Sequence, residues 1–440
     1  MSTNLAAVVM AGGLGTRMKS SVPKHLHPLL GRRVVDWVLE SARQLGADPV
    51  VVVASPETSD AYDGVTVAVQ GQARGTGDAV AAAQPSLEGF AGAVLVLDAA
   101  APLLTADLLS GLVAHHAGER ASVTVLTIDP GRALPYGRIV RGDDGTVLEI
   151  VEDRDATPEQ RAIRELNASI YVFDAHALRA SLAKLDSRNA QGELYLTDTV
   201  AHIVADGGRA VAFRSEDPTS PIGINNRAEL ALAASVLRDR INEAHMVAGV
   251  TIVDPATTWI DAGVELEPDV VVHPFTVLRG ATSVASGTEI GPHSVVVDAR
   301  IGQRVSIGPF CYLRPGTVLD HDAKAGTFVE IKNSRIGART KVPHLSYLGD
   351  ADVGEDSNIA AGNITANFPH EEGRPKGRTS IGSNVRTGIH NGFVAPVEIG
   401  DDAWIAAGSV ITKDVPPGAL GVARARQENK EGYASRKRDD

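Results

Sequence analysis

The sequence of 440 residues is long enough for two or three domains, each with its own hydrophobic core. Its 42 basic and 54 acidic residues give a net charge of −12, which argues against general binding of nucleic acids by the surface. The single cysteine, Cys311, excludes an intramolecular disulfide framework and fits a reducing, cytoplasmic environment. The first residues lack a signal-peptide pattern, and no apolar run reaches the ~18 residues that span a membrane.

Residues 1–226 alternate short apolar runs with amphipathic segments. The apolar runs predict strands at 5–13, 48–55, 65–69, 93–98 and 122–128. Between them, segments such as 34–46 have apolar residues at helical spacing and end in glycine. This alternation predicts an α/β domain with a mostly parallel sheet and helices on both of its faces.

Residues 227–249 predict a helix that links this domain to the rest of the chain. Leu230, Ala233, Leu237 and Ile241 form one apolar stripe along it.

From residue 250 onward the chain follows a six-residue period. Apolar or small residues recur at this interval, with single-residue slips and one polar interruption at 366–380: Ile301, Ile307, Leu313, Leu319, Ala325, Ile331; Ile336, Val342, Leu348; Val353, Ile359, Thr365; Ile381, Thr387, Phe393, Ile399, Ile405 and Ile411. A period of six fits neither an α-helix nor a simple meander. It predicts a parallel β-helix in which each hexad forms one flat side of a coil, with the apolar residue pointing inward. The interruption must loop out of the coils.

The stretch "MAGGLGTRM" (10–18) directly follows a predicted strand. Gly12, Gly13 and Gly15 let backbone N–H groups approach a polyphosphate, while Arg17 and the later Lys24 add positive charge. No Gly-Lys-Ser/Thr ends the loop, so it is not a Walker motif.

The stretches "GGLGTRM" (12–18) and "PKHL" (23–26) occur here together with hexapeptide repeats. In this combination the chain resembles, over nearly its whole length, the bifunctional N-acetylglucosamine-1-phosphate uridyltransferase/glucosamine-1-phosphate acetyltransferase family. The resemblance implies a Rossmann-like nucleotidyltransferase domain at 1–226, a linker helix at 227–249 and a left-handed β-helix acetyltransferase domain at 250–440. The first domain would join UTP to N-acetylglucosamine-1-phosphate with Mg²⁺. The second would acetylate glucosamine-1-phosphate with acetyl-CoA, so that the homotrimer supplies UDP-N-acetylglucosamine for peptidoglycan synthesis. The resemblance implies neither a nucleic-acid nor a membrane partner.

Further motifs of the first domain follow the family in order: "QGQARGTGDA" (70–79), "PYGRIV" (135–140), "IVEDRDAT" (150–157), "ELNASIYVF" (165–173) and "GINNRAEL" (223–230). The resemblance implies phosphate-binding and catalytic roles for Gly13, Arg17 and Lys24, and contacts to the uracil base from Gln70, Gly75 and Thr76. It also implies contacts to the sugar from Gly137, Glu152 and Asn167. Asn225 would be a ligand of Mg²⁺. Ala73 stands where the family often has a second glutamine, which predicts fewer contacts to the base.

The chain departs from the family at "VLVLDAAAPLL" (94–104). The aspartate that would be the second Mg²⁺ ligand falls on Ala100. Asp98 faces the same side of the strand but lies about 6–7 Å away along it, so it cannot simply replace that ligand. A water-bridged role for Asp98 stays open.

The β-helix carries the motifs of the acetyltransferase half. Loss of a proton from the substrate ammonium needs a base, and histidine is suited to that task near neutral pH. The resemblance assigns the role of base to His344, with Glu330 orienting it. It assigns phosphate contacts to Arg314 and Lys332 and sugar contacts to Tyr347 and Asn358. The residues implied to contact acetyl-CoA are Ala361, Asn367, Ala407 and either Lys376 or Arg378. The loop "NFPHEEG" (367–373) lacks the family's tyrosine, and Ile389 stands where a serine is common.

Three functions are therefore compatible with the sequence: a bifunctional enzyme with impaired uridylyl transfer, an acetyltransferase with an inactive nucleotide-binding domain, or a non-catalytic sugar-nucleotide sensor. The complete set around His344 disfavours the third.

Overall fold

The computed structural model describes residues 4–436 except 14, 133, 370–372 and 374. The described chain divides into two compact units, one ending at Leu237 and the other beginning at Arg238. The division lies inside α7 (Arg227–Val247), which coincides with the predicted linker helix. None of the helices in these ranges is long and apolar enough to cross a membrane.

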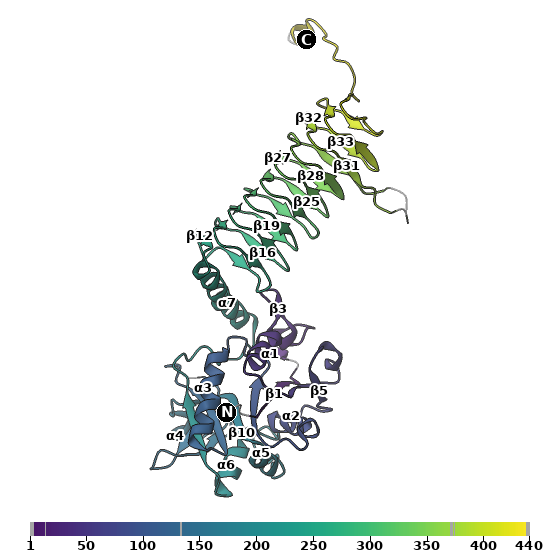
Figure 1. Ribbon diagram of the computed structural model, residues 1–440. Coiled ribbons are helices and arrows are strands. Elements are labelled where there is room, and N and C mark those ends of the chain that lie inside the picture. The colour runs from purple at the N-terminus through teal and green to yellow at the C-terminus, as the bar shows by residue number, and fades with distance from the viewer. Residues whose placement is uncertain (1–3, 14, 133, 370–372, 374, 437–440) are drawn as a thin grey trace. The chain divides into compact units, whose positions relative to one another are not determined.

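The first unit is built on one mixed sheet with the strand order β11-β7-β10-β6-β1-β4-β5 (Figure 1). Its strands are β1 (Leu5–Ala11), β4 (Val50–Ala54), β5 (Thr66–Val69), β6 (Ala93–Asp98), β7 (Val123–Ile128), β8 (Arg138–Arg141), β9 (Val147–Val151), β10 (Leu166–Asp174) and β11 (Ala210–Arg214). β10 runs antiparallel between β6 and β7, and the β8–β9 hairpin joins it. The predicted strands are confirmed, and the carboxyl ends of β1 and β6 lie side by side.

Helices cover both faces of this sheet. α1 (Val34–Gln44) and α3 (Ala106–Glu119) pack on one face, while α2 (Thr76–Ala82), α5 (Ala175–Leu182) and α6 (Asp198–Ala205) pack on the other. In β6, Leu95 and Leu97 pack in the core under α1 and α3, whereas Val94 and Val96 pack in the core under α2, α5 and α6. Because both faces are buried, the strand reads as a continuous apolar run.

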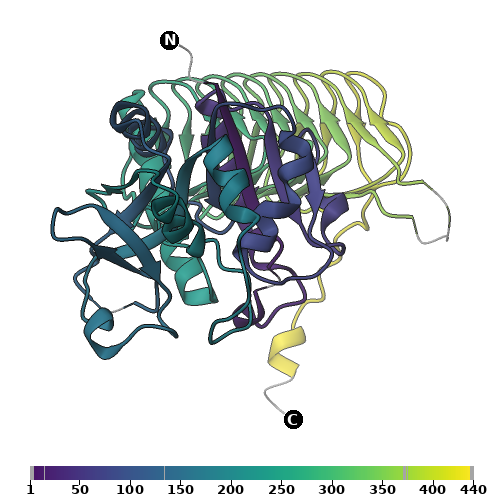
Figure 2. The same cartoon turned by 90° about the horizontal axis from the view of Figure 1, so that it is seen from below.

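The second unit is a parallel β-helix whose coils stack along one axis (Figure 2). The first face of its coils consists of β12 (Thr251–Ile252), β15 (Val271–Val272), β18 (Glu289–Ile290), β21 (Ser306–Ile307), β24 (Lys324–Thr327) and β27 (Lys341–His344), continued by β32 (Arg386–Thr387), β35 (Trp404–Ile405) and β37 (Leu420–Gly421).

The second face consists of β13 (Trp259–Ile260), β16 (Val277–Arg279), β19 (Val295–Val297), β22 (Tyr312–Leu313), β25 (Glu330–Lys332), β28 (Tyr347–Gly349), β30 (Ile364–Ala366), β33 (Gly392–Val394) and β36 (Val410–Ile411). The third face consists of β14 (Glu265–Leu266), β17 (Ser283–Val284), β20 (Arg300–Ile301), β23 (Val318–Leu319), β26 (Arg335–Ile336), β29 (Ala351–Val353), β31 (Thr379–Ile381) and β34 (Val397–Ile399). Short elements outside these layers are β2 (Pro28–Leu29), β3 (Arg32–Arg33), α4 (Pro158–Arg161) and α8 (Tyr433–Arg436).

The hexad prediction is confirmed residue by residue. Every predicted inward position from Ile301 to Ile411 is at most 7% exposed. Glycines after the inward residue let the coils approach each other, since a Cβ on Gly337 or Gly354 would lie 2.6 Å from the backbone of the next coil. The interior therefore fixes the register, and only the outward side chains are free to bind a ligand.

Candidate functional site

A cavity of about 290 Å³ lies at the carboxyl ends of β1 and β6 in the first unit. Five residues predicted from the sequence line it: Gly13, Lys24, Gln70, Gly75 and Thr76. Ligands of open α/β sheets bind at this end of the strands, where connections leave to opposite faces. The structure therefore brings these phosphate and base residues to one pocket, whereas Arg17, which was predicted with them, is not among the residues that line it.

Gln70 holds the floor of this cavity in place. Its buried side chain donates from Nε2 to the Gly75 carbonyl at 3.2 Å and to Asp78 Oδ2 at 2.8 Å. A Cβ on Gly12 would lie 2.5 Å from Gln70 Oε1, so a larger residue there would displace the end of the Gln70 side chain. Thr76 accepts a hydrogen bond from the Leu196 N–H at 3.0 Å. These contacts fix the pocket before any ligand enters.

The predicted sugar residues lie on neighbouring strands and loops. The Asn167 N–H donates to the Gly137 carbonyl at 2.8 Å, and Asn167 Nδ2 donates to the Tyr171 hydroxyl at 2.7 Å. Burial raises the pKa of Glu152, whose carboxylate accepts a hydrogen bond from Thr197 at 3.1 Å. These three residues do not line the 290 Å³ cavity itself.

Four polar side chains, which belong to Asp98, Lys24, Arg17 and Asn225, lie near the point where β6 ends. Asp98 Oδ1 accepts a hydrogen bond from the Ala100 N–H at 2.9 Å, and Asp98 Oδ2 lies 3.9 Å from Lys24 Nζ. Arg17 Nη2 donates to Asn225 Oδ1 at 2.8 Å. The Ala100 carbonyl accepts from the Ile224 N–H at 2.7 Å, and the Ala100 side chain is fully buried.

This arrangement does not fit a Mg²⁺ ion. Mg²⁺ requires several oxygen ligands, of which one or two are usually carboxylates. Here the side-chain oxygen of Asn225 is hydrogen-bonded to a guanidinium, and a buried methyl group stands at Ala100. Across the described ranges, no group of three or more His, Cys, Asp or Glu side chains is placed to hold a metal ion.

Several pocket residues were missed by the sequence reasoning, among them His25, Ser169 and Glu193. His25 is 1% exposed and stacks on Tyr62, with ring centroids 6.2 Å apart. Ser169 has a φ of 60° at the irregularity in β10 and also lines the cavity. A backbone conformation of this kind is uncommon for serine and is concentrated at functional sites. His25 and Ser169 lie inside the motifs "PKHL" and "ELNASIYVF", but the motifs alone assigned them no role, and the φ of Ser169 depends on the pairing of β10 with distant strands.

The second face of the β-helix presents a cluster of charged side chains. Arg314, which follows β22, donates from Nη1 to Glu330 Oε1 at 2.8 Å. Glu330 and Tyr347 are paired in register on β25 and β28, neighbouring strands in Figure 1. The pKa of Lys332 is lowered because the Lys376 ammonium lies beside it. Two adjacent ammonium groups and a guanidinium form a site suited to a phosphate.

His344 lies at the corner between the first and second faces. It ends β27 and is exposed, and the next residue, Leu345, has a φ of 48°. Ala361 and Ala407 lie near the same corner in later coils, where the His390 N–H donates to the Ala361 carbonyl at 2.9 Å. Asn358 is on the first face, bridged to Lys341 and Arg386. Within one chain the predicted acetyltransferase residues are therefore divided between two faces and a corner.

The loop after β30 brings two predicted residues to the second and third faces. Asn367 donates to the Asp350 carboxylate, which also accepts from Asn333 at 2.6 Å. Lys376 lies beside Lys332, whereas Arg378 is ion-paired with Asp352. Residues 370–372 and 374 of this loop lie outside the described residues. Of the two candidate cations, Lys376 is the one next to the phosphate-type cluster.

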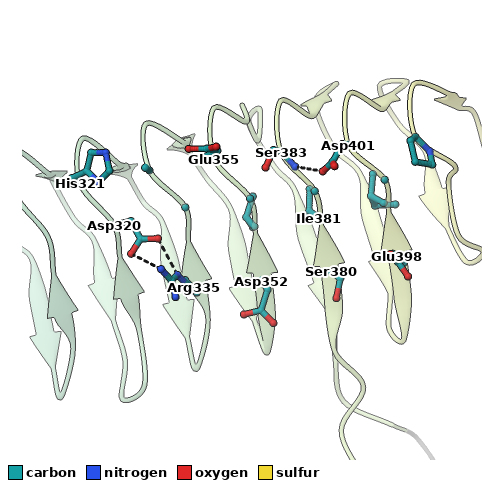
Figure 3. A pocket seen from close by; sticks show the side chains of 18 residues that line it. Asp320, His321, Arg335, Asp352, Glu355, Ser380, Ile381, Ser383, Glu398 and Asp401 are labelled. Carbon is teal, nitrogen blue, oxygen red and sulfur yellow. Dashed lines mark hydrogen bonds and ion pairs between the residues drawn. The ribbon is translucent and has the colours of Figure 1, made fainter.

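A larger hollow of about 800 Å³ runs along the third face (Figure 3). Its floor contains the glycines that allow close stacking, including Gly337, Gly354 and Gly382. Some of its polar groups are paired with each other: Asp320 with Arg335 at 2.9 Å, and Asp401 with the Ser383 N–H at 2.7 Å. No predicted site residue lines it, and we interpret it as a consequence of coil stacking.

Comparison with known proteins supports both halves. A family model described as "MobA-like NTP transferase domain" matches residues 7–194. A protein named "Bifunctional protein GlmU" from Trichlorobacter lovleyi is 44% identical over 458 residues, covering 99% of each chain. Proteins of the same name from Mycolicibacterium vanbaalenii and Streptomyces coelicolor are 46% and 47% identical, covering 98% of this chain and 93% and 94% of their own lengths.

His25 gives the first unit a pH-dependent stability. Burial and the neighbouring Lys24 lower its pKa from 6.5 to about 4, so the folded state favours the neutral ring. The unfolded chain binds the proton more tightly, and stability present above pH 6.5 is lost as the pH falls toward 4. We expect a loss of roughly 3 kcal/mol over this range that His25→Phe removes. Urea denaturation at several pH values measures it.

The exposed His176 provides the control, because His176→Gln should leave this dependence in place. An equally steep loss of stability in His25→Phe would show that another group titrates.

Proposed function

Because the chain belongs to the family of bifunctional GlmU proteins, we propose that it acetylates glucosamine-1-phosphate with acetyl-CoA and that its uridylyl transfer from UTP is impaired. The chain is a transferase with an NTP-transferase domain. In this proposal residues 1–226 form the uridyltransferase domain, 227–249 the linker helix and 250–440 the acetyltransferase domain. The alternative is an acetyltransferase whose first domain only binds nucleotide. A role as a sugar-nucleotide sensor alone is less well supported.

The observation that carries acetyl transfer is the cationic cluster on the second face of the β-helix. Arg314, Lys332 and Lys376 would hold the sugar phosphate, and Tyr347 and Asn358 the sugar. Ala361, Ala407 and Asn367 would contact acetyl-CoA. With the phosphate fixed, the amino group of the substrate is delivered to one position, which is the main benefit of such an anchor.

His344 would then act as the general base. Its imidazole accepts a proton from the substrate ammonium, and the freed amine attacks the thioester carbonyl. A C–N bond forms, the C–S bond breaks, and the thiolate of coenzyme A leaves and takes up a proton. Glu330 would help to orient His344; in a single chain its carboxylate accepts a hydrogen bond from Arg314.

Uridylyl transfer is expected to be slow because the side chains at the end of β6 do not fit Mg²⁺. Charge that develops on transferring phosphoryl groups is normally neutralised by cations, including a metal. Arg17 and Lys24 remain to supply positive charge, and Gly13, Gln70, Gly75 and Thr76 remain to bind nucleotide.

We further propose that the chain forms a homotrimer that completes each acetyltransferase site between neighbouring β-helices. Phe275, His293, Phe310 and Phe328 stack along the corner that leads to His344, with centroids 4.7, 4.9 and 5.1 Å apart. The three phenylalanines are 52%, 47% and 56% exposed, and the following Leu345 is 58% exposed. A contiguous exposed apolar ridge is typical of an interface.

The Cys311 thiol is buried, and burial raises its pKa to about 12. A free thiol of this kind is compatible with a reducing compartment. We propose the cytoplasm, where acetyl-CoA and UTP are made, as the site of the reaction.

Replacing the base should abolish acetyl transfer selectively. His344→Asn is expected to lower kcat for acetylation about 10²–10⁴-fold, because the ammonium keeps its proton. Release of coenzyme A thiol measures the reaction. His321→Asn, an exposed histidine on the third face, is the matched control and should retain full activity. Equal losses in both variants, or none in His344→Asn, would contradict the assignment.

Restoring the family's motif should restore uridylyl transfer. The Ala99→Gly, Ala100→Asp double variant is expected to raise Mg²⁺-dependent pyrophosphate release from UTP by about 10–100-fold or more. Acetylation should stay unchanged, because the change lies in the other unit. Ordinary Mg²⁺-dependent turnover by the unmodified chain would refute the proposed impairment.

The trimer predicts a solution mass of three times 46.0 kDa. Phe310→Asn with Phe328→Asn should shift the chain to monomers, since asparagine tolerates the positive φ at both positions and removes the apolar ridge. Sedimentation equilibrium measures the mass. Leu232→Asn, which changes an exposed leucine outside the ridge, should leave the mass unchanged. A monomeric unmodified chain would exclude the trimer.

A further inference from the structure

We infer that Arg17 replaces the divalent cation at the end of β6, so that the first domain binds the diphosphate of a uridine nucleotide without a metal ion. The inference rests on the proposed nucleotide-binding role of residues 1–226. It goes further because it assigns the phosphate-neutralising charge to a side chain and predicts how binding responds to Mg²⁺.

The first step is the hydrogen bond between Arg17 and Asn225. Arg17 Nη2 donates to Asn225 Oδ1 at 2.8 Å, which is the oxygen that the family resemblance assigns to the metal. Arginine stays protonated in proteins, so its charge remains at this oxygen at any physiological pH. A divalent cation on the same oxygen would face a guanidinium within hydrogen-bond distance. The two cations exclude each other.

The second step concerns the remaining carboxylates. Asp98 is bonded to the Ala100 N–H and faces Lys24, 3.9 Å away. Glu229 accepts from the Asn225 N–H at 2.7 Å and from Asn226 Nδ2 at 2.8 Å. Both carboxylates therefore have partners already. Asp98 Oδ1 and both Glu229 oxygens accept hydrogen bonds, and Asp98 Oδ2 faces the Lys24 ammonium, so neither carboxylate stands in for the one that is missing at Ala100.

The third step is the charge that the site offers to a ligand. Lys24 lines the cavity beside Gly12 and Gly13 and offsets Asp98. Arg17 adds a further positive charge, and Tyr136 lies within electrostatic reach of both Arg17 and Asp98. The Arg17 side chain is exposed, and its hydrogen bond to Asn225 uses Nη2, so other N–H groups of the same guanidinium can donate to a ligand while that bond stays in place. A guanidinium fork matches the oxygens of a diphosphate in shape and charge.

Calorimetric titration of the full chain with UDP-N-acetylglucosamine, in EDTA and in excess MgCl₂, tests the inference. We expect the same Kd within about twofold in both buffers. Arg17→Gln should weaken binding about tenfold in EDTA, the loss typical of one charge-assisted hydrogen bond. Lys19→Gln, which removes an exposed cation two residues away, is the matched control and should change Kd less than twofold.

The double variant Ala99→Gly, Ala100→Asp provides the converse test, since its added carboxylate should make binding at least tenfold tighter in MgCl₂ than in EDTA. Binding by the unmodified chain that requires Mg²⁺, or unchanged binding by Arg17→Gln in EDTA, would overturn the inference alone. Absence of binding in both buffers would overturn the proposed nucleotide role as well. Thermal unfolding of Arg17→Gln, together with Arg17→Lys as a charge-retaining variant, separates a lost contact from a lost fold.

Discussion

The narrow interior of the β-helix is the constraint on which the acetyltransferase half depends. Each flat side of a coil buries its hexad residue, often with a second small or apolar residue two positions earlier, and a Cβ on Gly337 or Gly354 would already collide with the next coil. The inward residues therefore set the register of every strand. Because Glu330 and Tyr347 are paired in that register, and Arg314 and Lys332 are held on the same face, the charged cluster is positioned by packing rather than by its own contacts.

A different constraint governs the end of β6. Charges that converge at the carboxyl ends of parallel strands must be balanced, by a ligand, by a metal or by each other. In this chain Asp98 and Lys24 balance each other, whereas Arg17 is hydrogen-bonded to the neutral side chain of Asn225 and keeps its positive charge for a ligand. The pocket keeps its shape because Gln70 and Gly75 are fixed by their own hydrogen bonds.

Much of the fold could be predicted because its determinants are local. The hexads from Ile301 to Ile411 were all identified as inward residues, whereas the inward residues of the earlier coils were not named, and the valine- and leucine-rich runs identified the strands around β1 and β6. The antiparallel insertion of β10 was not predicted, since it depends on pairing with strands far away in the sequence. Ser169 acquires its positive φ from that same pairing.

The candidate site shows the same limit. Motifs identified the residues that line the first cavity, because each motif is a short continuous stretch. The contact between Arg17 and Asn225 joins positions 208 residues apart, and nothing in either motif indicates it. Likewise, the sequence did not choose between Lys376 and Arg378, whereas the structure pairs Arg378 with Asp352 and leaves Lys376 beside Lys332.

In both units the residues that determine the fold are separate from those that carry the chemistry. Ala100 is fully buried, so its methyl group packs within the core while it removes a metal ligand. A charged side chain at the same buried position would require a partner, and without a metal it would destabilise the fold. Alanine avoids that cost at this strand end. The β-helix has its own core, so the proposed loss of the metal ligand concerns residues of the first unit alone.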